Sequence, residues 1–452
     1  MPPEPFDGNS PHVLLVNPWI HDFAAYDFWA NPLGLLILAS ILRQQGARVS
    51  YIDCLDRFHP KASLKDPGAR NGRGPYLKTP IPYPPGLEDI PRRFSRYGIR
   101  KEWFARDLAS LSAPDLVLVT SMMTYWYPGV RETIGDIKSA FPDVPVVLGG
   151  VYATLCRDHA VKTSGADRVI SGSGVDQILN LVAEYTGWSA APVFHPEDFN
   201  TWPFPALDLQ HRIPFVPLLT SLGCPFACAY CASRVLNPFP MKRDPARVVA
   251  EIRYWHDRFG VLDFAFYDDA LLFDAQRHAV PLLEGIIRSG IKARFHTPNA
   301  LHIREISDAL AKLIKKAGFH TIRIGLETGD FSGRSGNLDR KVTQSDFVRA
   351  VSSLKKAGFQ KDRIGAYLLV GLPGEAAADV EASIKLVKAS GITPVPAHYT
   401  PIPHTALWTQ AVKASRYDLE NDPVFTNNAL SPCRKEGFDW RKLSHLKKLA
   451  SA

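Results

Sequence analysis

Three cysteines in one short stretch are the residues of this sequence whose spacing most clearly suggests chemistry. Cys224, Cys228 and Cys231 form a Cys-x3-Cys-x2-Cys pattern just after an apolar stretch, where a loop is expected. Thiolates this close together can wrap one [4Fe–4S] cluster, for which cysteines are the usual ligands. Three ligands leave one iron open, and an open iron suits a catalytic cluster better than an electron-transfer cluster. The pattern therefore predicts a catalytic iron–sulfur site.

A structural zinc site is the alternative interpretation of the three thiols. Such sites normally use four ligands, often as paired Cys-x2-Cys motifs. Here the fourth ligand would have to be Cys433, which lies far along the chain. The remaining cysteines, Cys54 and Cys156, are single, so six cysteines in 452 residues do not make a disulfide framework.

The cysteine stretch resembles the signature of the radical S-adenosylmethionine (SAM) superfamily, including an aromatic residue, Tyr230, before the last cysteine. Three later stretches resemble further motifs of that family, in the same order. They are Phe266–Asp269, near the SAM amino group, Ile324–Thr328, a Gly/Glu strand, and Leu369–Glu375, a Gly-Leu-Pro-Gly-Glu turn near adenine. The resemblance covers residues 214–403. It implies an enzyme that uses a [4Fe–4S] cluster to cleave SAM to a 5′-deoxyadenosyl radical.

Carboxylates at strand ends are the first candidates for contacts with SAM. Of Asp268 and Asp269, we expect one to accept a hydrogen bond from the SAM ammonium and the other to cap the next helix. Glu327 interrupts an apolar strand, so it needs a partner if buried, either SAM or a salt bridge. Asn299 and His296 are candidates for ribose or substrate contact, or are satisfied core residues. The expected cofactor contacts in this half are Tyr230, Asp268, Asp269, Asn299, Glu327, Gly371 and Pro373.

The elements around these residues alternate between strands and helices, which predicts a partial, open (β/α)6 barrel. Six strands are too few for a closed eight-stranded barrel, and functional groups of such folds gather at the carboxyl ends of strands. The strands are expected at 215–221, 262–269, 293–299, 321–328, 363–371 and 394–400, with helices that include 305–317 and 345–357.

The first part of the chain also alternates strands and helices, as a separate α/β domain. Continuous apolar strands between helices predict a Rossmann-like parallel sheet covered on both faces, with ligands at the carboxyl ends of its strands. The strands are expected at 12–18, 48–53, 115–121, 144–150 and 166–172, with helices at 33–45, 130–141 and 175–185. The candidate ligand contacts are Asn17, Pro18, Ser121, Gly149 and Gly150.

This first part resembles the cobalamin-binding domain of many radical SAM enzymes over residues 12–187. The motifs are Leu15–Pro18, Pro32–Leu35 and Leu148–Thr154. No Asp-x-His occurs in the chain, so bound cobalamin would have no histidine ligand on its lower face. Ser171–Gly174 departs from the Gly-Glu-Gly-Glu that relatives tend to have, which leaves a vestigial or a substrate-binding domain as alternatives.

Two features of the first domain have both a ligand-binding and a purely structural interpretation. Gly149-Gly150 would let a flat macrocycle approach the backbone, or would only form a tight turn. The Met122–Tyr127 strip, with Tyr26, Phe28 and Trp29, could form a wall against a corrin or flat substrate, or could pack inside the protein.

The combined resemblance implies methylation of an unactivated carbon or phosphorus centre, with a small-molecule or peptide substrate. Cyclisation or rearrangement is the alternative within the family, and an external flavodoxin- or ferredoxin-type electron donor is expected. A tRNA methylthiotransferase would need a second three-cysteine cluster, whereas only Cys54 and Cys156 precede the motif. A zinc or RNA-binding protein and a cobalamin carrier are further alternatives. The sequence forces no acid–base pair; His21, His296 and His398 are possible.

The charge of the chain is concentrated in one segment. Residues 57–106 hold twelve Lys/Arg and four Asp/Glu, which accounts for the net charge of +8. A uniformly basic nucleic-acid binder would not look like this, so we do not expect nucleic acid as a partner. The segment is either a patch for an anionic substrate, cofactor phosphate or nucleic acid, or a solvated, irregular insertion.

The predicted organisation is a domain over 1–187, a linker over 188–214, a radical SAM domain over 215–403 and a tail over 404–452. We expect the tail to be irregular from Trp408, with a basic amphipathic end at 440–449. No apolar run is long enough to span a membrane, and the acidic, Pro-rich start does not resemble a secretory signal. A cytoplasmic protein is therefore expected.

Overall fold

The computed structural model describes residues 10–63, 66–331, 338, 342–435 and 438–451. The chain divides into two compact units. Unit 1 comprises residues 1–214 and 421–424, and unit 2 comprises residues 215–420 and 425–452. The domain, linker and tail boundaries given above stay predictions. Within the described ranges, no helix combines the length and the apolar character that a membrane crossing requires.

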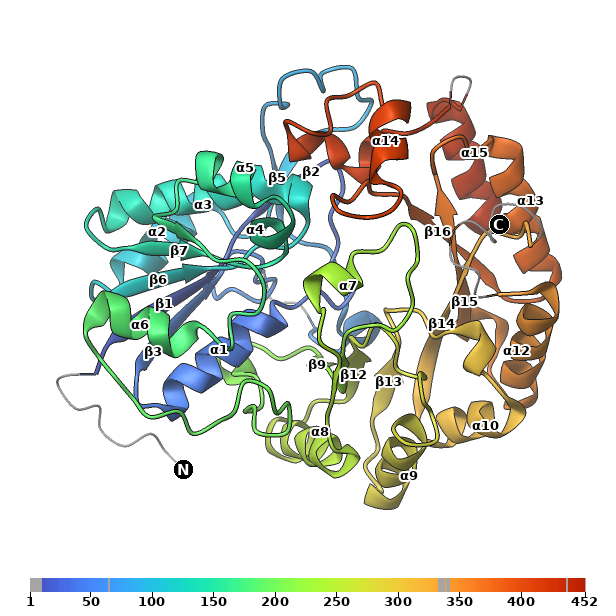
Figure 1. Ribbon diagram of the computed structural model, residues 1–452, viewed down its shortest axis with the longest axis horizontal. Coiled ribbons are helices and arrows are strands. Elements are labelled where there is room, and N and C mark those ends of the chain that lie inside the picture. Colours follow the sequence, from blue (N-terminus) through green and yellow to red (C-terminus); the bar gives the residue numbers. More distant parts are fainter. Residues whose placement is uncertain (1–9, 64–65, 332–337, 339–341, 436–437, 452) are drawn as a thin grey trace. The chain divides into compact units, whose positions relative to one another are not determined.

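A five-stranded parallel sheet forms the centre of unit 1, in the order β3-β1-β6-β7-β8. All five predicted strands are present, which confirms the Rossmann-like parallel sheet. Helices cover both faces of the sheet (Figure 1), so the central strand β1 is buried along its whole length. The elements of unit 1 are β1 (His12–Asn17), β2 (Ile20–Asp22), α1 (Leu33–Gln44), β3 (Arg48–Asp53), η1 (Ala69–Gly72), β4 (Lys78–Pro80), β5 (Ser95–Tyr97), α2 (Lys101–Ala109), β6 (Leu116–Val119), η2 (Thr124–Trp126), α3 (Tyr127–Ala140), β7 (Val146–Leu148), α4 (Val151–Leu155), α5 (Arg157–Thr163), β8 (Arg168–Val169), α6 (Ile178–Thr186) and η3 (Leu207–Leu209).

Part of the basic segment 57–106 has regular structure. Its strands β4 and β5 join β2, which follows β1, in a three-stranded antiparallel sheet. Its last residues begin α2, and Phe104 of that helix is fully buried. The interpretation of this segment as a solvated, irregular insertion is therefore wrong for residues 95–106, whereas most of the described residues between 58 and 93 lie in turns and loops.

A six-stranded parallel sheet forms the centre of unit 2, in the order β16-β15-β14-β13-β12-β9. Each strand lies beside the next in sequence order, which confirms the partial (β/α)6 architecture. The elements of unit 2 are β9 (Val216–Leu218), β10 (Ser221–Leu222), α7 (Ser233–Leu236), β11 (Met241–Lys242), α8 (Pro245–Phe259), β12 (Asp263–Phe266), α9 (Ala279–Ser289), β13 (Arg294–His296), η4 (Ile303–Glu305), α10 (Asp308–Lys316), β14 (Phe319–Glu327), α12 (Gln344–Lys356), η5 (Lys361–Arg363), β15 (Ile364–Val370), α13 (Ala377–Ala389), β16 (Thr393–His398), α14 (Trp408–Ala414), η7 (Asn428–Leu430) and α15 (Trp440–Ser451).

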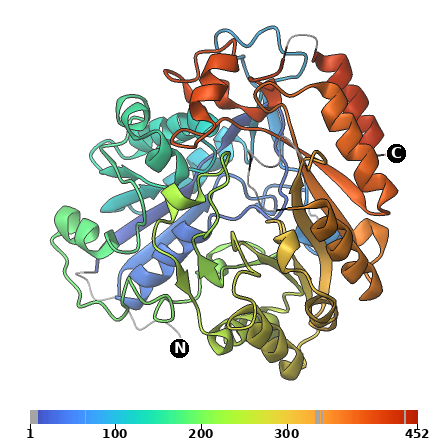
Figure 2. The same cartoon turned by 45° about the vertical axis from the view of Figure 1, so that its right-hand side comes forward.

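Local sequence signals define the ends of several unit 2 helices. Asp244 caps the first turn of α8, and Gly260 ends that helix in the left-handed conformation. Thr343 and Asp346 form a capping box at the start of α12. The segment from Trp408 contains a helix, α14, so the expectation of an irregular stretch there is wrong. The basic amphipathic stretch predicted at 440–449 forms a helix, α15, which packs against α13 and β16 (Figure 2).

Candidate functional site

A cavity of about 250 Å³ lies at the carboxyl ends of the unit 2 strands and contains the cysteine motif. It brings together seven of the residues predicted from the sequence, on loops that follow four different strands. They are Cys224, Cys228, Tyr230, Cys231, Asp269, Asn299 and Glu327. Asp268, Gly371 and Pro373 do not line it, and their positions are described below.

The cysteine loop runs between β10 and β11, which pair with each other and close the loop at its base. All three thiols are half-buried. The Ser233 amide donates to Cys231 Sγ over 3.4 Å, and the Ser233 hydroxyl lies 3.2 Å from the same sulfur. Hydrogen bonds to ligand sulfurs are a normal feature of iron–sulfur sites and tune their potential. The loop therefore has the thiol arrangement and the N–H donor that a cluster uses.

The thiols do not have the arrangement of a single-ion site. Among the described residues, no three His, Cys, Asp or Glu side chains are grouped closely enough to hold one metal ion. In a cubane each thiolate binds a different iron, so its ligands lie farther apart than those of one zinc ion. Cys433 is fully buried among apolar side chains, its thiol donates to the Ala411 carbonyl, and burial raises its pKa to about 12. These observations favour a cluster over zinc.

Asp268 forms hydrogen bonds with Thr220 and Ser221, the residues that come just before the cysteine loop. Its carboxylate accepts hydrogen bonds from the hydroxyls of Thr220 and Ser221, both at 2.6 Å, and from the Thr220 amide. The Thr220 hydroxyl also contacts His278 Nε2 at 2.8 Å. Burial raises the pKa of Asp268 and lowers that of His278 to about 4. Asp268 therefore positions the loop from within the protein, a role that the sequence did not indicate.

Asp269 and Asn299 face the cavity from the ends of β12 and β13. Burial raises the pKa of Asp269, against the effect of a hydrogen bond from Ser233, the residue that also contacts Cys231. The Asn299 amide donates to the Tyr267 carbonyl over 2.6 Å, which joins the two strand ends. Neither aspartate is the N-cap residue of α9, so the expected capping role is wrong.

Glu327 enters the cavity through an irregularity in β14. The register with β15 shifts between Gly325 and Glu327, and Glu327 has a left-handed φ of 65°. Gly325 lies beside it, and a Cβ there would lie 2.8 Å from Glu327 Oε1, so a larger residue would displace the carboxylate. Bulges of this kind re-aim a side chain and are frequent next to functional sites. The sequence alone suggested a carboxylate inside a regular strand.

The Gly-Leu-Pro-Gly-Glu turn, which contains Gly371 and Pro373, packs next to Tyr230 of the cavity wall. Tyr230 packs against an apolar cluster that includes Leu372 of the Gly-Leu-Pro-Gly-Glu turn. Glu375 closes this turn by accepting hydrogen bonds from the amides of Gly371 and Leu372. The glutamate of the motif is thus a structural residue, and Gly371 has the positive φ of 88° that the turn requires.

Sequence reasoning missed several residues of the cavity wall. Phe226, His302 and Tyr367 line it, and the Phe226 and His302 rings lie 4.2 Å apart. His302 follows β13, and Tyr367 lies between two smaller residues of β15, so strand alternation could have indicated the tyrosine. His296, by contrast, is fully buried and contacts Asp263 and Thr321, which assigns it to the core.

In unit 1 the candidate residues occupy the carboxyl ends of neighbouring strands. Asn17 ends β1, and its amide donates to Asp53 at the end of β3 over 2.7 Å. Pro18, next in the chain, is also buried. Burial, reinforced by nearby Asp56, raises the pKa of Asp53 to about 7. This edge therefore holds a carboxyl group that changes charge near neutral pH.

We expect the stability of unit 1 to fall as the pH rises from about 4 to 7. Native Asp53 retains its proton up to about pH 7, whereas an unfolded aspartate loses it near 3.8. The native state therefore binds more protons in this window, and the free energy of unfolding drops by at most about 4 kcal/mol. Asp53→Asn should flatten the profile, measured by urea unfolding at several pH values. A matched change at exposed Asp143 should not; equal profiles in wild type and Asp53→Asn would refute the assignment.

The two glycines after β7 have different surroundings. Gly150 has a φ of 95°, and a Cβ on it would lie 2.3 Å from the Ser121 carbonyl oxygen. Its need for glycine thus follows from packing against Ser121, without any ligand. Gly149 has open space where a Cβ would point, and its carbonyl accepts the Ser121 hydroxyl at 2.6 Å. Only Gly149 has room for close approach of a ligand.

Substituting each glycine separates these two roles. Gly150→Ala is expected to destabilise unit 1 by about 3 kcal/mol or more, because the backbone conformation is strained and the methyl group has no room. Gly149→Ala should leave the free energy of unfolding within about 0.5 kcal/mol of wild type, while weakening corrinoid binding. Urea unfolding and corrinoid titration measure the two effects. A stable Gly150→Ala chain would contradict the packing argument.

The aromatic strip after β6 packs mostly within unit 1. Tyr125 is 2% exposed, and the Trp126 indole donates to Asp22 over 2.6 Å. The Tyr127 ring stacks on that of Tyr152, with centroids 5.7 Å apart. Met123 is the exposed apolar residue of the strip, at 42%. Packing inside the protein therefore accounts for the rings of Tyr125, Trp126 and Tyr127.

Comparison with known proteins identifies both halves of the chain. The Radical SAM superfamily matches residues 218–387, and the B12 binding domain matches residues 97–182. An uncharacterized methyltransferase, PH0819, from Pyrococcus horikoshii is 26% identical over 66% of this chain and 70% of its own length. The anaerobic magnesium-protoporphyrin IX monomethyl ester cyclase of Rubrivivax gelatinosus is 24% identical over 70% of this chain and 62% of its own.

A solved structure extends the likeness in fold to most of the chain. The radical SAM methyltransferase TsrM from Kitasatospora setae, with cobalamin and a [4Fe–4S] cluster bound, matches with a TM-score of 0.63. The match covers 90% of this chain and 76% of TsrM, at 18% identity. The first matched region contains the cysteine loop and most of the unit 2 strands, and the second contains the Ser121 and Gly149 loops. The chain therefore contains a radical SAM domain and, before it in the sequence, a B12-binding domain.

Proposed function

We propose that this protein is a cobalamin-dependent radical SAM enzyme that methylates an unactivated carbon or phosphorus centre. The observation that carries the proposal is the single cavity into which Cys224, Cys228 and Cys231 converge with Asp269, Asn299 and Glu327. A three-cysteine cluster beside carboxylate and amide groups provides an open iron and acceptors for an amino acid cofactor. The match to a B12-binding domain supports the cobalamin dependence in the proposal.

Two of the similar proteins are described as methyltransferases, which favours methyl transfer over cyclisation. PH0819 and TsrM are both called methyltransferases, and TsrM was solved with cobalamin and a [4Fe–4S] cluster. The Rubrivivax gelatinosus relative is called a cyclase, which keeps cyclisation as the second candidate. Both reactions use the same cluster and SAM site, so the choice concerns the substrate and not the cavity.

The residues of unit 2 have distinct tasks in this proposal. When bound, the cofactors would relay an electron to SAM and supply the 5′-deoxyadenosyl radical and the methyl group. The three thiolates hold the cluster and leave one iron open to the amino and carboxylate groups of SAM. Glu327 and Asp269 would accept hydrogen bonds from the N–H groups of the SAM amine and from its ribose. The turn at Gly371 and Pro373 lies against adenine, through the apolar cluster that also packs on Tyr230.

In unit 1, Asn17, Pro18, Ser121 and the open side of Gly149 would hold the corrinoid at the carboxyl edge of the sheet. The sequence has no Asp-x-His motif, so no histidine of that kind would serve as a cobalt ligand. The substrate is a small molecule or a peptide. The electron comes from an external flavodoxin- or ferredoxin-type donor.

Anaerobic reconstitution with iron, sulfide and cobalamin tests this function directly. We expect about four irons per chain, the visible spectrum of a bound corrinoid and, once the cluster is reduced with dithionite, cleavage of SAM to 5′-deoxyadenosine. SAM carrying a deuterated methyl group then separates the two reactions, because only methyl transfer places the label in a product. A chain that binds zinc, or that cleaves no SAM when fully loaded with iron, would refute the proposal.

A further inference from the structure

Two loops at the carboxyl edge of the unit 1 sheet are joined by a buried ion pair. One loop follows β2, the short strand after β1, and the other follows β3. Arg57 Nε lies 2.8 Å from Asp27 Oδ2, with side chains only 5% and 7% exposed. Losing one partner of such a buried pair typically costs about 3–5 kcal/mol. This edge is where parallel α/β sheets bind ligands.

Backbone contacts strengthen the same junction. Asp27 and Gly74 exchange hydrogen bonds of 3.0 and 3.2 Å, and Arg57 also donates to the Gly72 carbonyl. Gly74 is needed there, because a Cβ would lie 2.2 Å from the Arg57 guanidinium. The strands β2 and β5 pair beyond this point. The basic segment is therefore fixed over the carboxyl edge.

The junction holds three residues other than glycine in the left-handed conformation. Trp29, Arg70 and Asn71 have φ values of 68°, 52° and 59°. Each such residue costs of order 1–3 kcal/mol, and the conformation persists only where its surroundings enforce it, often at ligand clamps. Here the Trp29 indole donates to the Asn71 carbonyl over 2.8 Å. The fixed backbone of this turn therefore sets the positions from which the Arg70 and Arg73 side chains extend.

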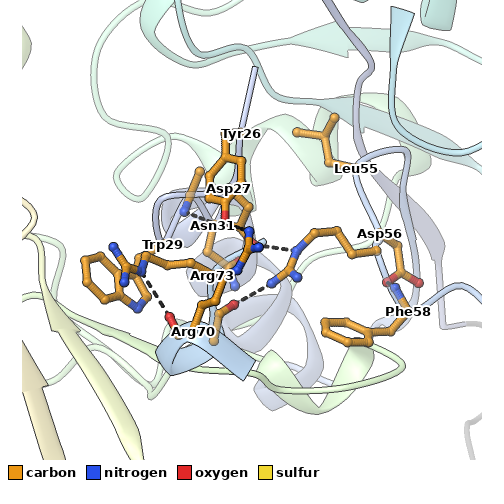
Figure 3. A network of polar contacts seen from close by, with 12 residues as sticks. Tyr26, Asp27, Trp29, Asn31, Leu55, Asp56, Phe58, Arg70 and Arg73 are labelled. Atoms are coloured by element: carbon orange, nitrogen blue, oxygen red, sulfur yellow. Dashed lines mark hydrogen bonds and ion pairs between the residues drawn. The ribbon is translucent and has the colours of Figure 1, made fainter. Parts of the chain in front are cut away.

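Both arginines of the strained turn are held in place by aromatic residues. The Arg73 guanidinium lies 4.6 Å from the centre of the Trp29 ring, and its Nε donates to the Arg70 carbonyl. Arg70 donates to the Tyr26 hydroxyl over 2.9 Å (Figure 3). Stacked, planar guanidinium groups are pre-organised to bind carboxylate or phosphate.

The Arg70 guanidinium has N–H donors available for a ligand. Its guanidinium offers five N–H donors, and among the described residues it forms no ion pair with an acidic side chain. It is exposed, and the neighbouring Phe28 is 62% exposed. The Phe28 and Tyr26 rings lie 4.6 Å apart. An exposed aromatic pair beside an unneutralised cation suits a ligand with an apolar body and an anionic group.

We propose that Arg70 and Arg73, beside Phe28, bind the anionic group of the substrate, a carboxylate or phosphate attached to an apolar or aromatic body. That the ligand is the substrate rests on the proposed function. The phosphate in the nucleotide tail of cobalamin has the same chemistry, so the experiment must separate the two sources.

The first arm measures binding of phenyl phosphate to the full reconstituted chain by titration calorimetry. We expect saturable, salt-sensitive binding that weakens about tenfold in Arg70→Gln and in Arg73→Gln, the loss of a charge-assisted hydrogen bond. Arg93→Gln is the matched control, because Arg93 is exposed in the same basic segment. No saturable binding to wild type, or equal binding by all variants, would overturn the site.

The second arm compares cobalamin with cobinamide, the corrinoid that lacks the nucleotide phosphate. If the site binds substrate, each arginine variant keeps the wild-type preference between the two corrinoids. A preference lost together with phenyl phosphate binding would assign the site to the cobalamin tail and overturn the substrate assignment. SAM cleavage by the same wild-type preparation shows separately whether the proposed function stands.

Discussion

A Cys228→Ala chain is expected to lose its cluster and to produce no 5′-deoxyadenosine. Each thiolate of the Cys-x3-Cys-x2-Cys loop is expected to bind one iron of the cubane. Removal of the middle cysteine leaves two ligands, which are too few to retain the cluster. The loop is half-buried and closed by β10 and β11, so the fold itself should persist. Iron and sulfide content, measured after anaerobic reconstitution, should fall to near background.

The control for this variant is Cys156→Ala. Cys156 is a half-buried cysteine of unit 1, and burial raises its pKa to about 12, which makes it a protonated thiol and a poor ligand. Cys156→Ala should retain wild-type iron and SAM cleavage. Wild-type cleavage in Cys228→Ala would contradict the assignment of the cysteine loop.

The second large effect is expected from Asp268→Ala. Removal of the carboxylate leaves the hydroxyls of Thr220 and Ser221 and the Thr220 amide buried without their acceptor. Stranding donors of a buried carboxylate network costs about 3–5 kcal/mol. Unit 2 should unfold at lower urea concentration, and the loop that begins at Ser221 should retain less iron. Both quantities can be measured on one preparation.

A conservative variant distinguishes positioning from bulk packing. Asp268→Asn keeps the shape and one acceptor oxygen, so it should recover part of the iron content, with a cluster spectrum closer to wild type than that of the alanine variant. Asp257→Ala, which removes an exposed carboxylate of α8, should change neither quantity. Wild-type unfolding and iron content in Asp268→Ala would contradict the positioning role.

The sequence predicted what depends on local spacing. The three cysteines lie within one loop, and the presence of the eleven parallel strands follows from alternating apolar and helical segments. Asn299 and Glu327 could be expected near the cysteines, because the carboxyl ends of parallel strands meet at one edge. For these features, short-range pattern and fold class were sufficient.

The rest depends on contacts between distant residues, which a single sequence does not encode visibly. Nothing in the Asp268-Asp269 pair indicates which carboxylate points inward to Thr220. The left-handed turn at Glu327 arises from a register shift between β14 and β15. Arg57 looked like one of twelve solvated cations in its segment, whereas it is buried against Asp27.

The glycines after β7 show the same limit in another way. Gly149 and Gly150 are equivalent in the sequence, and both interpretations of the pair were possible. The positive φ of Gly150 and the backbone of Ser121 assign one to packing, and the open space at Gly149 leaves the other for a ligand. Only the path of the chain separates them.

Electron paramagnetic resonance of the reduced, reconstituted chain tests the central claim most directly. A cluster with three cysteine ligands and one open iron is expected to change its spectrum when SAM is added, because the cofactor binds that iron. An iron-loaded chain whose signal is identical with and without SAM would contradict the account, as would a chain whose cysteine loop holds zinc.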